Sequence, residues 1–155
     1  MKYRLLMISL ASLAILTSCS SGCCSSTEEK KSFTEYEIVS KQSITWEDVF
    51  KQQDRYAVFF YNEYCSYCHE MQSEIVDFAF INIIPTYFID TTYSNVVIKK
   101  DKDPITGVSS LNDLYIKGTP TIIEINEGTV VSNVSGLDDC LTYLNTQRKN
   151  ANNNL

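Results

Sequence analysis

Several short stretches of this chain are continuous in aromatic and branched apolar residues. The longest is residues 56–61, and a run without polar interruption is typical of a strand buried on both faces. The run at 86–90 predicts a second strand, and residues 121–126 and 130–134 predict a hairpin that turns at Glu127-Gly128. We also expect residues 35–40 to form the first strand of the domain.

Other stretches repeat apolar residues at helical spacing. A helix is predicted from about residue 65 to just before Pro85, with one apolar face that carries Cys68, Met71, Ile75, Phe78 and Ala79. A last helix is lined by Leu137, Leu141 and Leu144, and short helices are expected at 45–53 and 109–116. The predicted order of elements is βαβαβαββα, which is that of an α/β domain without an internal repeat.

The first eighteen residues have the pattern of an export signal. Lys2 and Arg4 precede an apolar run from residue 5 to residue 16, which is well short of the ~20 residues that span a bilayer. The following Leu16-Thr17-Ser18-Cys19 resembles the bacterial lipobox, in which small residues precede a lipidated cysteine. The resemblance implies that residues 1–18 are a lipoprotein signal peptide and that Cys19 anchors the protein outside the bacterial cytoplasmic membrane. An ordinary secretory leader is the alternative.

Composition divides the rest of the chain into one domain and two tails. The 155 residues, 44% of them hydrophobic, suffice for one core, which we expect within residues 34–148. Residues 19–33 have the composition of a flexible tether, and residues 149–155 that of a disordered tail. The net charge is −6 and becomes −8 once Lys2 and Arg4 are cleaved away, which disfavours nucleic acid as a partner.

The residues that carry chemistry are the two cysteines of Cys65-Ser66-Tyr67-Cys68. They lie where a buried strand is followed by a helix, and the free N–H groups and dipole of a helix N-terminus stabilise a thiolate. Cys65 is therefore the expected nucleophile. Cys68 lies one helical turn further along the same face, so its sulfur can reach Cys65 and resolve a mixed disulfide.

Together with Gly118-Thr119-Pro120-Thr121, this motif resembles the thioredoxin superfamily over residues 35–147. The resemblance implies a three-layer α/β sandwich with a central mixed β-sheet, a cis Pro120, and a Thr119 backbone that pairs with an extended substrate. It also implies a thiol–disulfide oxidoreductase that needs no dissociable cofactor. Its partners would be protein or peptide thiols and disulfides, and a redox protein that recycles the cysteine pair. Oxidant, reductant and isomerase roles all stay open.

The sequence departs from the family pattern close to the motif. Tyr64 stands where the family commonly has Trp, and Phe59 stands where many members carry a buried carboxylate. No obvious acid is therefore expected to help deprotonate Cys68. A polar stretch at 94–108 precedes the proline loop and is expected to be a solvated loop.

Three other functions draw on the same residues. A zinc site would need more ligands than one His and a single Cys-x-x-Cys provide. The run from Cys65 to His69 also spells the c-type haem attachment motif, with His69 as an axial ligand. The third is a non-catalytic accessory module for peptide or bacteriocin export. The flanking strand and helix and the proline loop favour the redox function over haem.

The remaining candidate residues have more ordinary interpretations. Tyr67, between the cysteines, is expected to be exposed and to contact peptide substrates. His69 is expected to be a partly exposed helix residue, with a role beside the Cys65 thiolate as the alternative. Cys140 lies among apolar positions and is expected to be a buried small hydrophobe. Cys23 and Cys24, in the tether, have no evident partner.

Overall fold

A four-stranded mixed β-sheet is the centre of the molecule. The computed structural model describes residues 31–153. The strands are β1 (Arg55–Tyr61), β2 (Thr86–Asp90), β3 (Thr121–Asn126) and β4 (Thr129–Ser135), in the order β2-β1-β3-β4. β1 and β2 are parallel, whereas β3 is antiparallel to both β1 and β4. All four predicted strands from residue 56 onward are confirmed.

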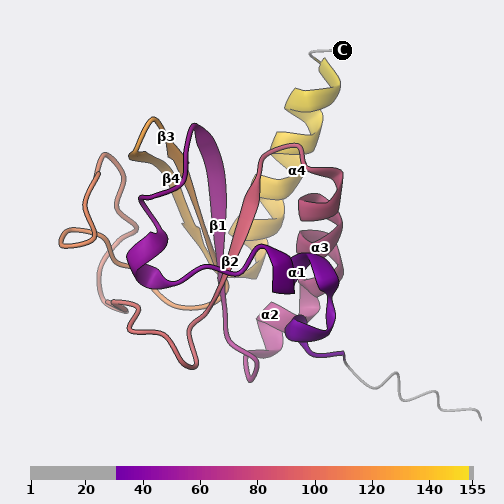
Figure 1. The fold of residues 1–155 in the computed structure, drawn as a ribbon, viewed down its shortest axis with the longest axis horizontal. Coiled ribbons are helices and arrows are strands. Elements are labelled where there is room, and N and C mark those ends of the chain that lie inside the picture. Colours follow the sequence, from indigo (N-terminus) through magenta and orange to yellow (C-terminus); the bar gives the residue numbers. More distant parts are fainter. Residues whose placement is uncertain (1–30, 154–155) are drawn as a thin grey trace, which may run out of the picture.

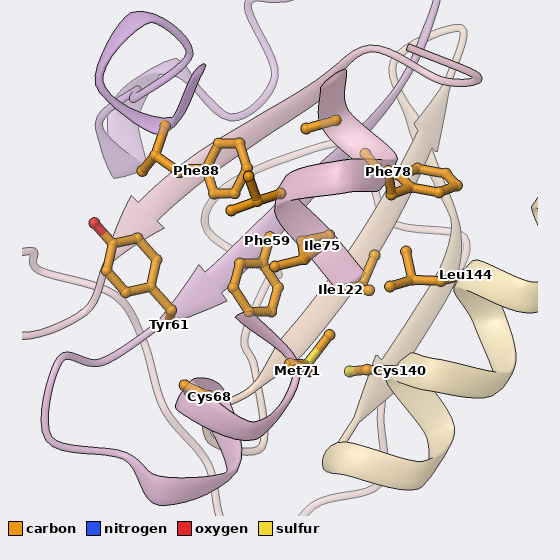
Figure 2. Packing of buried hydrophobic residues seen from close by; sticks show 14 of the residues in the cluster. Phe59, Tyr61, Cys68, Met71, Ile75, Phe78, Phe88, Ile122, Cys140 and Leu144 are labelled. Carbon is orange, nitrogen blue, oxygen red and sulfur yellow. The ribbon is translucent and has the colours of Figure 1, made fainter. Parts of the chain in front are cut away.

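The helices gather on one face of this sheet (Figure 1). They are α1 (Glu37–Lys41), α2 (Ser66–Glu70), α3 (Gln72–Ile81) and α4 (Leu137–Asn153), with a 3-10 turn η1 (Phe33–Glu35) before α1. Figure 2 shows Phe59 from β1 and Ile122 from β3 packed against Ile75 and Leu144 of α3 and α4. The predicted apolar face of the dithiol helix is confirmed, because its five members are all buried in this cluster.

The opposite face of the sheet is covered mainly by irregular chain. The 3-10 turn η2 (Trp46–Asp48) and residues between β2 and β3 pack there on Val58, Phe60 and Ile123. Trp46, Leu114 and Ile116 are the large buried side chains of this layer. The molecule is thus a thioredoxin-like α/β sandwich whose second outer layer is largely coil.

Residues 35–40 do not form the predicted first strand. Phe33, Tyr36 and Val39 recur every three residues, and that spacing suits the short helical elements η1 and α1 rather than a strand. The edge of β2 is instead paired over one bridge, where the Phe88 N–H donates to Gln42 O and the Ile44 N–H donates to Phe88 O.

Three predicted helices also differ from the structure. The helix expected at 45–53 is reduced to η2, and no helix forms at 109–116, where alternate residues Leu114 and Ile116 are buried and Ile116 bridges to Ile98. A spacing of two residues between buried positions belongs to extended chain. The helix expected from residue 65 is two helices that meet at Met71, and it ends at Ile81, before a left-handed Asn82.

The limits of the folded part differ slightly from the expectation. The Phe33 side chain is fully buried, and α4 continues to Asn153, five residues past the expected end of the domain. The signal peptide, most of the tether and Cys19, Cys23 and Cys24 lie outside the described residues. Among residues 31–153, no helix combines the length and apolar character needed to cross a membrane.

Candidate dithiol site

Cys65 is placed at the start of α2 by a tight turn that follows β1. The Asn62 side chain accepts a hydrogen bond from the Tyr64 N–H at 2.9 Å, and the Asn62 carbonyl accepts one from the Cys65 N–H at 3.0 Å. Cys65 is the N-cap of α2, and its Sγ accepts a hydrogen bond from the Cys68 N–H at 3.4 Å. The sulfur thus satisfies one of the free N–H groups of the helix, as the sequence predicts for a nucleophile.

The proline loop lies on the other side of the same sulfur. The Thr119–Pro120 peptide bond is cis, as the resemblance implies. The Cys65 thiol donates to the Thr119 carbonyl with an Sγ···O distance of 3.4 Å. The structure therefore brings together the two motifs, which are 54 residues apart in the chain.

A shallow groove of about 330 Å³ runs beside this contact. Its walls are Tyr67 of α2, residues 117–119 of the proline loop, and Ser135 and Gly136 at the end of β4. The Tyr67 side chain is 56% exposed, so its predicted exposure is confirmed. Its contact with substrates stays a prediction, as does that of Thr119 and Pro120.

Cys68 differs from Cys65 in being shielded. Its side chain lies on the inner face of α2 and is fully buried, whereas Cys65 is half-buried. Burial, followed by the nearby Cys65 sulfur, raises the pKa of the Cys68 thiol to about 12. At neutral pH Cys68 is therefore protonated and shielded, which suits a thiol that acts second rather than first.

No carboxylate stands next to Cys68 in the described part of the chain. The Phe59 ring occupies the position that is often acidic in the family, and it is fully buried. A buried carboxylate does exist on the same face of the sheet, at Glu124 in β3, but it lies three residues beyond Thr121 and away from the dithiol. Three residues of extended strand place Glu124 roughly 10 Å from Thr121, the first residue after the proline loop.

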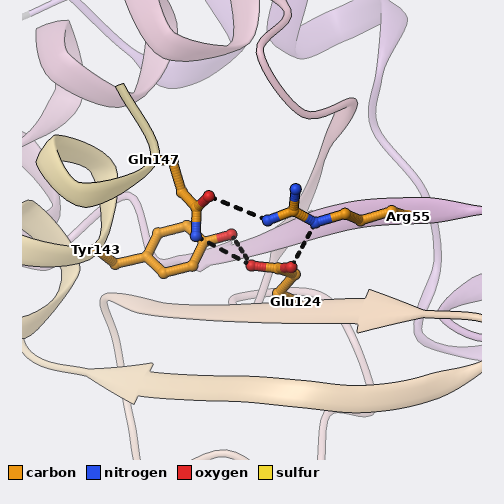
Figure 3. Close-up of polar contacts among 4 residues, drawn as sticks. All are labelled: Arg55, Glu124, Tyr143 and Gln147. Carbon is orange, nitrogen blue, oxygen red and sulfur yellow. Dashed lines mark hydrogen bonds and ion pairs between the residues drawn. The ribbon is translucent and has the colours of Figure 1, made fainter. Parts of the chain in front are cut away.

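Glu124 is held by donors from two other elements (Figure 3). Arg55 Nε donates to it at 2.6 Å, the Tyr143 hydroxyl at 2.8 Å and Gln147 Nε2 at 3.3 Å. Burial and the Glu124 carboxylate raise the pKa of Tyr143, so its hydroxyl remains a donor. The cluster is a structural one. Only the alternation of β3, which places Glu124 on the face of Ile122, hints at it in the sequence.

His69 is partly exposed, as expected, and has a defined partner. Its Nε2 lies 2.7 Å from the Glu63 carbonyl oxygen, and its ring packs 5.9 Å from that of Phe33. The imidazole is thus bonded to the turn that precedes Cys65. The sequence offers no sign of this contact, because it depends on the N-terminal segment.

The haem interpretation does not fit this geometry. A c-type haem is bonded to both cysteine sulfurs and needs a free imidazole nitrogen. Here Cys68 is fully buried, His69 Nε2 is hydrogen bonded to the Glu63 carbonyl, and His69 Nδ1 is buried. Among residues 31–153, no three His, Cys, Asp or Glu side chains are arranged to hold a metal ion.

Cys140 lies beneath the proline loop. Its thiol is fully buried in α4 and donates to Val134 O at 3.6 Å and to Pro120 O at 3.8 Å. Burial raises the pKa of this thiol to about 12. The prediction of a buried small hydrophobe is confirmed, and the sequence did not show that it touches Pro120.

Two exposed tyrosines beside the dithiol were not predicted. Tyr64 is 81% exposed next to Cys65, and Tyr93 is 84% exposed in the loop after β2. The register of β1 and β2 pairs Tyr61 with Asp90, so the loops that follow both strands leave the same edge of the sheet. Tyr64 raises the pKa of Tyr93, which is consistent with their proximity.

The fold and the site define a thioredoxin-like domain with a paired cysteine motif facing a cis-proline loop. No protein-family model and no curated protein matches this chain. Solved structures with a similar fold include thioredoxin f2 from Chlamydomonas reinhardtii, with 18% identity over 67% of this chain and 93% of that chain and a TM-score of 0.47. Mitochondrial thioredoxin 3 from Saccharomyces cerevisiae has 15% identity, over 68% of this chain and 93% of that chain, with a TM-score of 0.48. A thioredoxin-fold protein from Helicobacter pylori has 18% identity, over 82% of this chain and 100% of that chain, with a TM-score of 0.42.

Proposed function

We propose that this protein is a thiol–disulfide oxidoreductase whose redox pair is Cys65 and Cys68. The observation that carries the proposal is the position of the Cys65 sulfur, which lies half-buried between the Cys68 N–H and the Thr119 carbonyl. A nucleophilic sulfur needs access and nearby donors, and a resolving sulfur needs to be close and protected. The two cysteines divide these properties between them.

The reaction runs in two exchanges. The Cys65 thiolate attacks one sulfur of a substrate disulfide, the substrate S–S bond breaks, and its other sulfur leaves as a thiolate. The Cys68 sulfur then attacks Cys65 Sγ and releases the substrate, while the departing thiolates take up one proton from Cys68 and one from solvent. The substrate gains two electrons and two protons, and the cysteine pair becomes a disulfide. The reverse sequence oxidises a substrate dithiol.

The groove beside Cys65 suits an extended segment of protein or peptide. Tyr67 provides an exposed aromatic side chain at one wall, and Thr119 provides backbone at another. A second redox protein of the same chemistry would restore the pair after each turnover. The direction of net electron flow depends on that partner and on the reduction potential of the pair.

We further propose that the domain works outside the bacterial cytoplasmic membrane, attached through a lipid on Cys19. The support is the sequence of the leader, namely two basic residues, a short apolar run and a cysteine after small residues. Two acyl chains on one residue anchor a protein stably, because each buried CH₂ contributes ~0.8 kcal/mol.

The redox proposal is tested by trapping substrates in cysteine variants. Cys68→Ser should accumulate mixed disulfides with partner proteins that dissolve on addition of dithiothreitol, because Cys65 attacks and no internal thiol releases the product. Cys65→Ser should capture little, because Cys68 is buried and protonated. Cys23, Cys24 and Cys140 are replaced by Ala in both proteins, so that no other thiol mimics the result.

Two results would contradict the assignment. Equal trapping by both variants would show that nucleophile and resolving thiol are not distinguished as proposed. If the unmodified pair neither exchanges with glutathione nor traps any protein as Cys68→Ser, the domain is a non-catalytic module, such as the export accessory.

A further inference from the structure

The N-terminal end of the described chain lies directly against the dithiol helix. Residues 31–33 come just before the range 35–40 that was expected to form the first strand, and they contact α3 and the turn before α2, on the side of the molecule where the helices gather (Figure 1). Four separate contacts join this segment to residues that flank Cys65 and Cys68. These contacts have no part in the exchange chemistry proposed above.

Phe33 makes the apolar contacts. Its side chain is 0% exposed, and its ring stacks on Tyr61 with 4.4 Å between centroids and an interplanar angle of 28°. The same ring lies 5.9 Å from His69. Tyr61 ends β1 and His69 directly follows Cys68, so one side chain contacts both ends of the segment that carries the cysteines.

Polar contacts fix the same segment from outside. The Ser32 hydroxyl donates to Glu63 Oε1 at 2.9 Å, and Gln72 Nε2, at the start of α3, donates to the Lys31 carbonyl at 2.9 Å. His69 Nε2 donates to the Glu63 carbonyl at 2.7 Å, because a carbonyl oxygen can only accept. Glu63 is therefore held through its backbone by α2 and through its side chain by the N-terminal segment.

The helix α2 needs such support. It has five residues, and isolated helices shorter than about 12 residues are marginal in water, so its position is set by packing. Two features of the dithiol depend on that position, namely the cover over Cys68 and the 3.4 Å contact of the Cys68 N–H with Cys65 Sγ. Fraying of α2 would alter both features at once.

We propose that residues 31–33 are a positioning element of the dithiol site and that Phe33 is its principal positioning residue. The proposal rests on the redox function of Cys65 and Cys68 proposed above. The docked segment keeps α2 against the end of β1, so that Cys65 is presented and Cys68 is covered. Residues 31–33, at the end of the predicted tether, therefore belong to the structural support of the site.

The test compares Phe33→Leu with Phe60→Leu. Both remove a fully buried aromatic ring that contacts another aromatic ring, but Phe60 faces the opposite side of the sheet, next to Trp46. The full chain is reduced and pulsed with iodoacetamide, and the peptide that contains Cys65 and Cys68 is analysed by mass spectrometry. The rate of the second alkylation reports how often Cys68 is uncovered.

Phe33→Leu should raise that rate by about fivefold, since an aromatic pair contributes on the order of 1 kcal/mol, or roughly a fivefold change in an equilibrium constant. The equilibrium with glutathione should shift toward the disulfide, because the reduced form loses its Cys68 N–H contact. Phe60→Leu should lower the thermal midpoint of unfolding about as much as Phe33→Leu does. It should leave the rate of the second alkylation and the equilibrium with glutathione unchanged. Equal changes in both variants, or no change in either, would overturn the proposal.

A milder pair of variants covers the case in which Phe33→Leu fails to fold. Ser32→Ala removes one hydrogen bond to Glu63, and Ser43→Ala removes one hydrogen bond to Val39, which joins α1 to the chain that follows it and involves no residue of α2 or of the turn before it. Only Ser32→Ala should speed the second alkylation, by about twofold. If the unmodified chain does not exchange with glutathione and Cys68→Ser traps no protein, the redox proposal fails, but the alkylation comparison still decides whether residues 31–33 position α2.

Discussion

Cys140 links the stability of the protein to pH in the alkaline range. Burial raises the pKa of this thiol from an ordinary value of 9.0 to about 12. Between these two values the unfolded chain releases the proton and the folded chain keeps it. The folded state then binds more protons than the unfolded state, so the free energy of unfolding must fall as pH rises through this window.

The size of the effect follows from the difference between pH and the ordinary pKa. At about pH 10.5 the unfolded thiol lies roughly 1.5 pH units above its pKa while the folded thiol is still mostly protonated, which costs about 2 kcal/mol at 1.36 kcal/mol per unit. A domain of this kind has a total stability of about 5–15 kcal/mol. The loss from this single buried thiol is therefore measurable.

Urea unfolding at pH 8 and at about pH 10.5, with reductant present, isolates the contribution. Cys140→Ala should be less stable than the wild type at pH 8 and should lose about 2 kcal/mol less on the change of pH. Leu144→Ala leaves a cavity in the same helix but keeps the thiol, and it should lose as much as the wild type. The other buried thiol and the buried tyrosines are common to all three proteins and cancel. An equal loss in wild type and Cys140→Ala would refute the reasoning.

Two further predictions concern the anchor and the polar cluster. Cys19→Ala should move the protein from the detergent phase to the aqueous phase or leave an uncleaved precursor, and unchanged partitioning would remove the lipoprotein proposal. Tyr143→Phe should lower the free energy of unfolding by about 1.5–3 kcal/mol, because it removes a hydrogen bond to the charged Glu124 carboxylate. The Tyr56 hydroxyl donates to the uncharged Val49 carbonyl. Tyr56→Phe should therefore lower the free energy of unfolding by only about 1 kcal/mol in the same denaturation assay.

The parts of the fold that were predicted are those with a local cause. Residues 56–61 can be recognised as a central strand because every side chain in the run is apolar or aromatic, and all six are buried. The cysteine motif and the proline loop are each defined by four adjacent residues. Their meeting across the site follows from the resemblance to a fold in which they face one another.

The parts that were missed depend on contacts between distant segments. The three-residue spacing of Phe33, Tyr36 and Val39 suits short helices, but the docking of Phe33 on Tyr61 and His69, which buries this face, cannot be recognised in the sequence. The donors to Glu124 come from β1 and α4, and no spacing in the sequence connects them. Similarly, the chain at 109–116 gains its buried positions from a bridge to Ile98 rather than from helical periodicity.

The polar cluster around Glu124 has a consequence for the wall of the groove. Tyr143 and Gln147 both reach this carboxylate, and Cys140, one turn earlier in α4, touches the Pro120 carbonyl at the other end of β3. α4 therefore contacts β3 at one end and Pro120 at the other. A displacement of α4 by one turn, about 5.4 Å, would break both contacts. The proline loop is thereby tied to the frame of the sheet. On the facing side, the five-residue α2 is held by separate contacts from the N-terminal segment, so the two walls of the groove are anchored independently of each other.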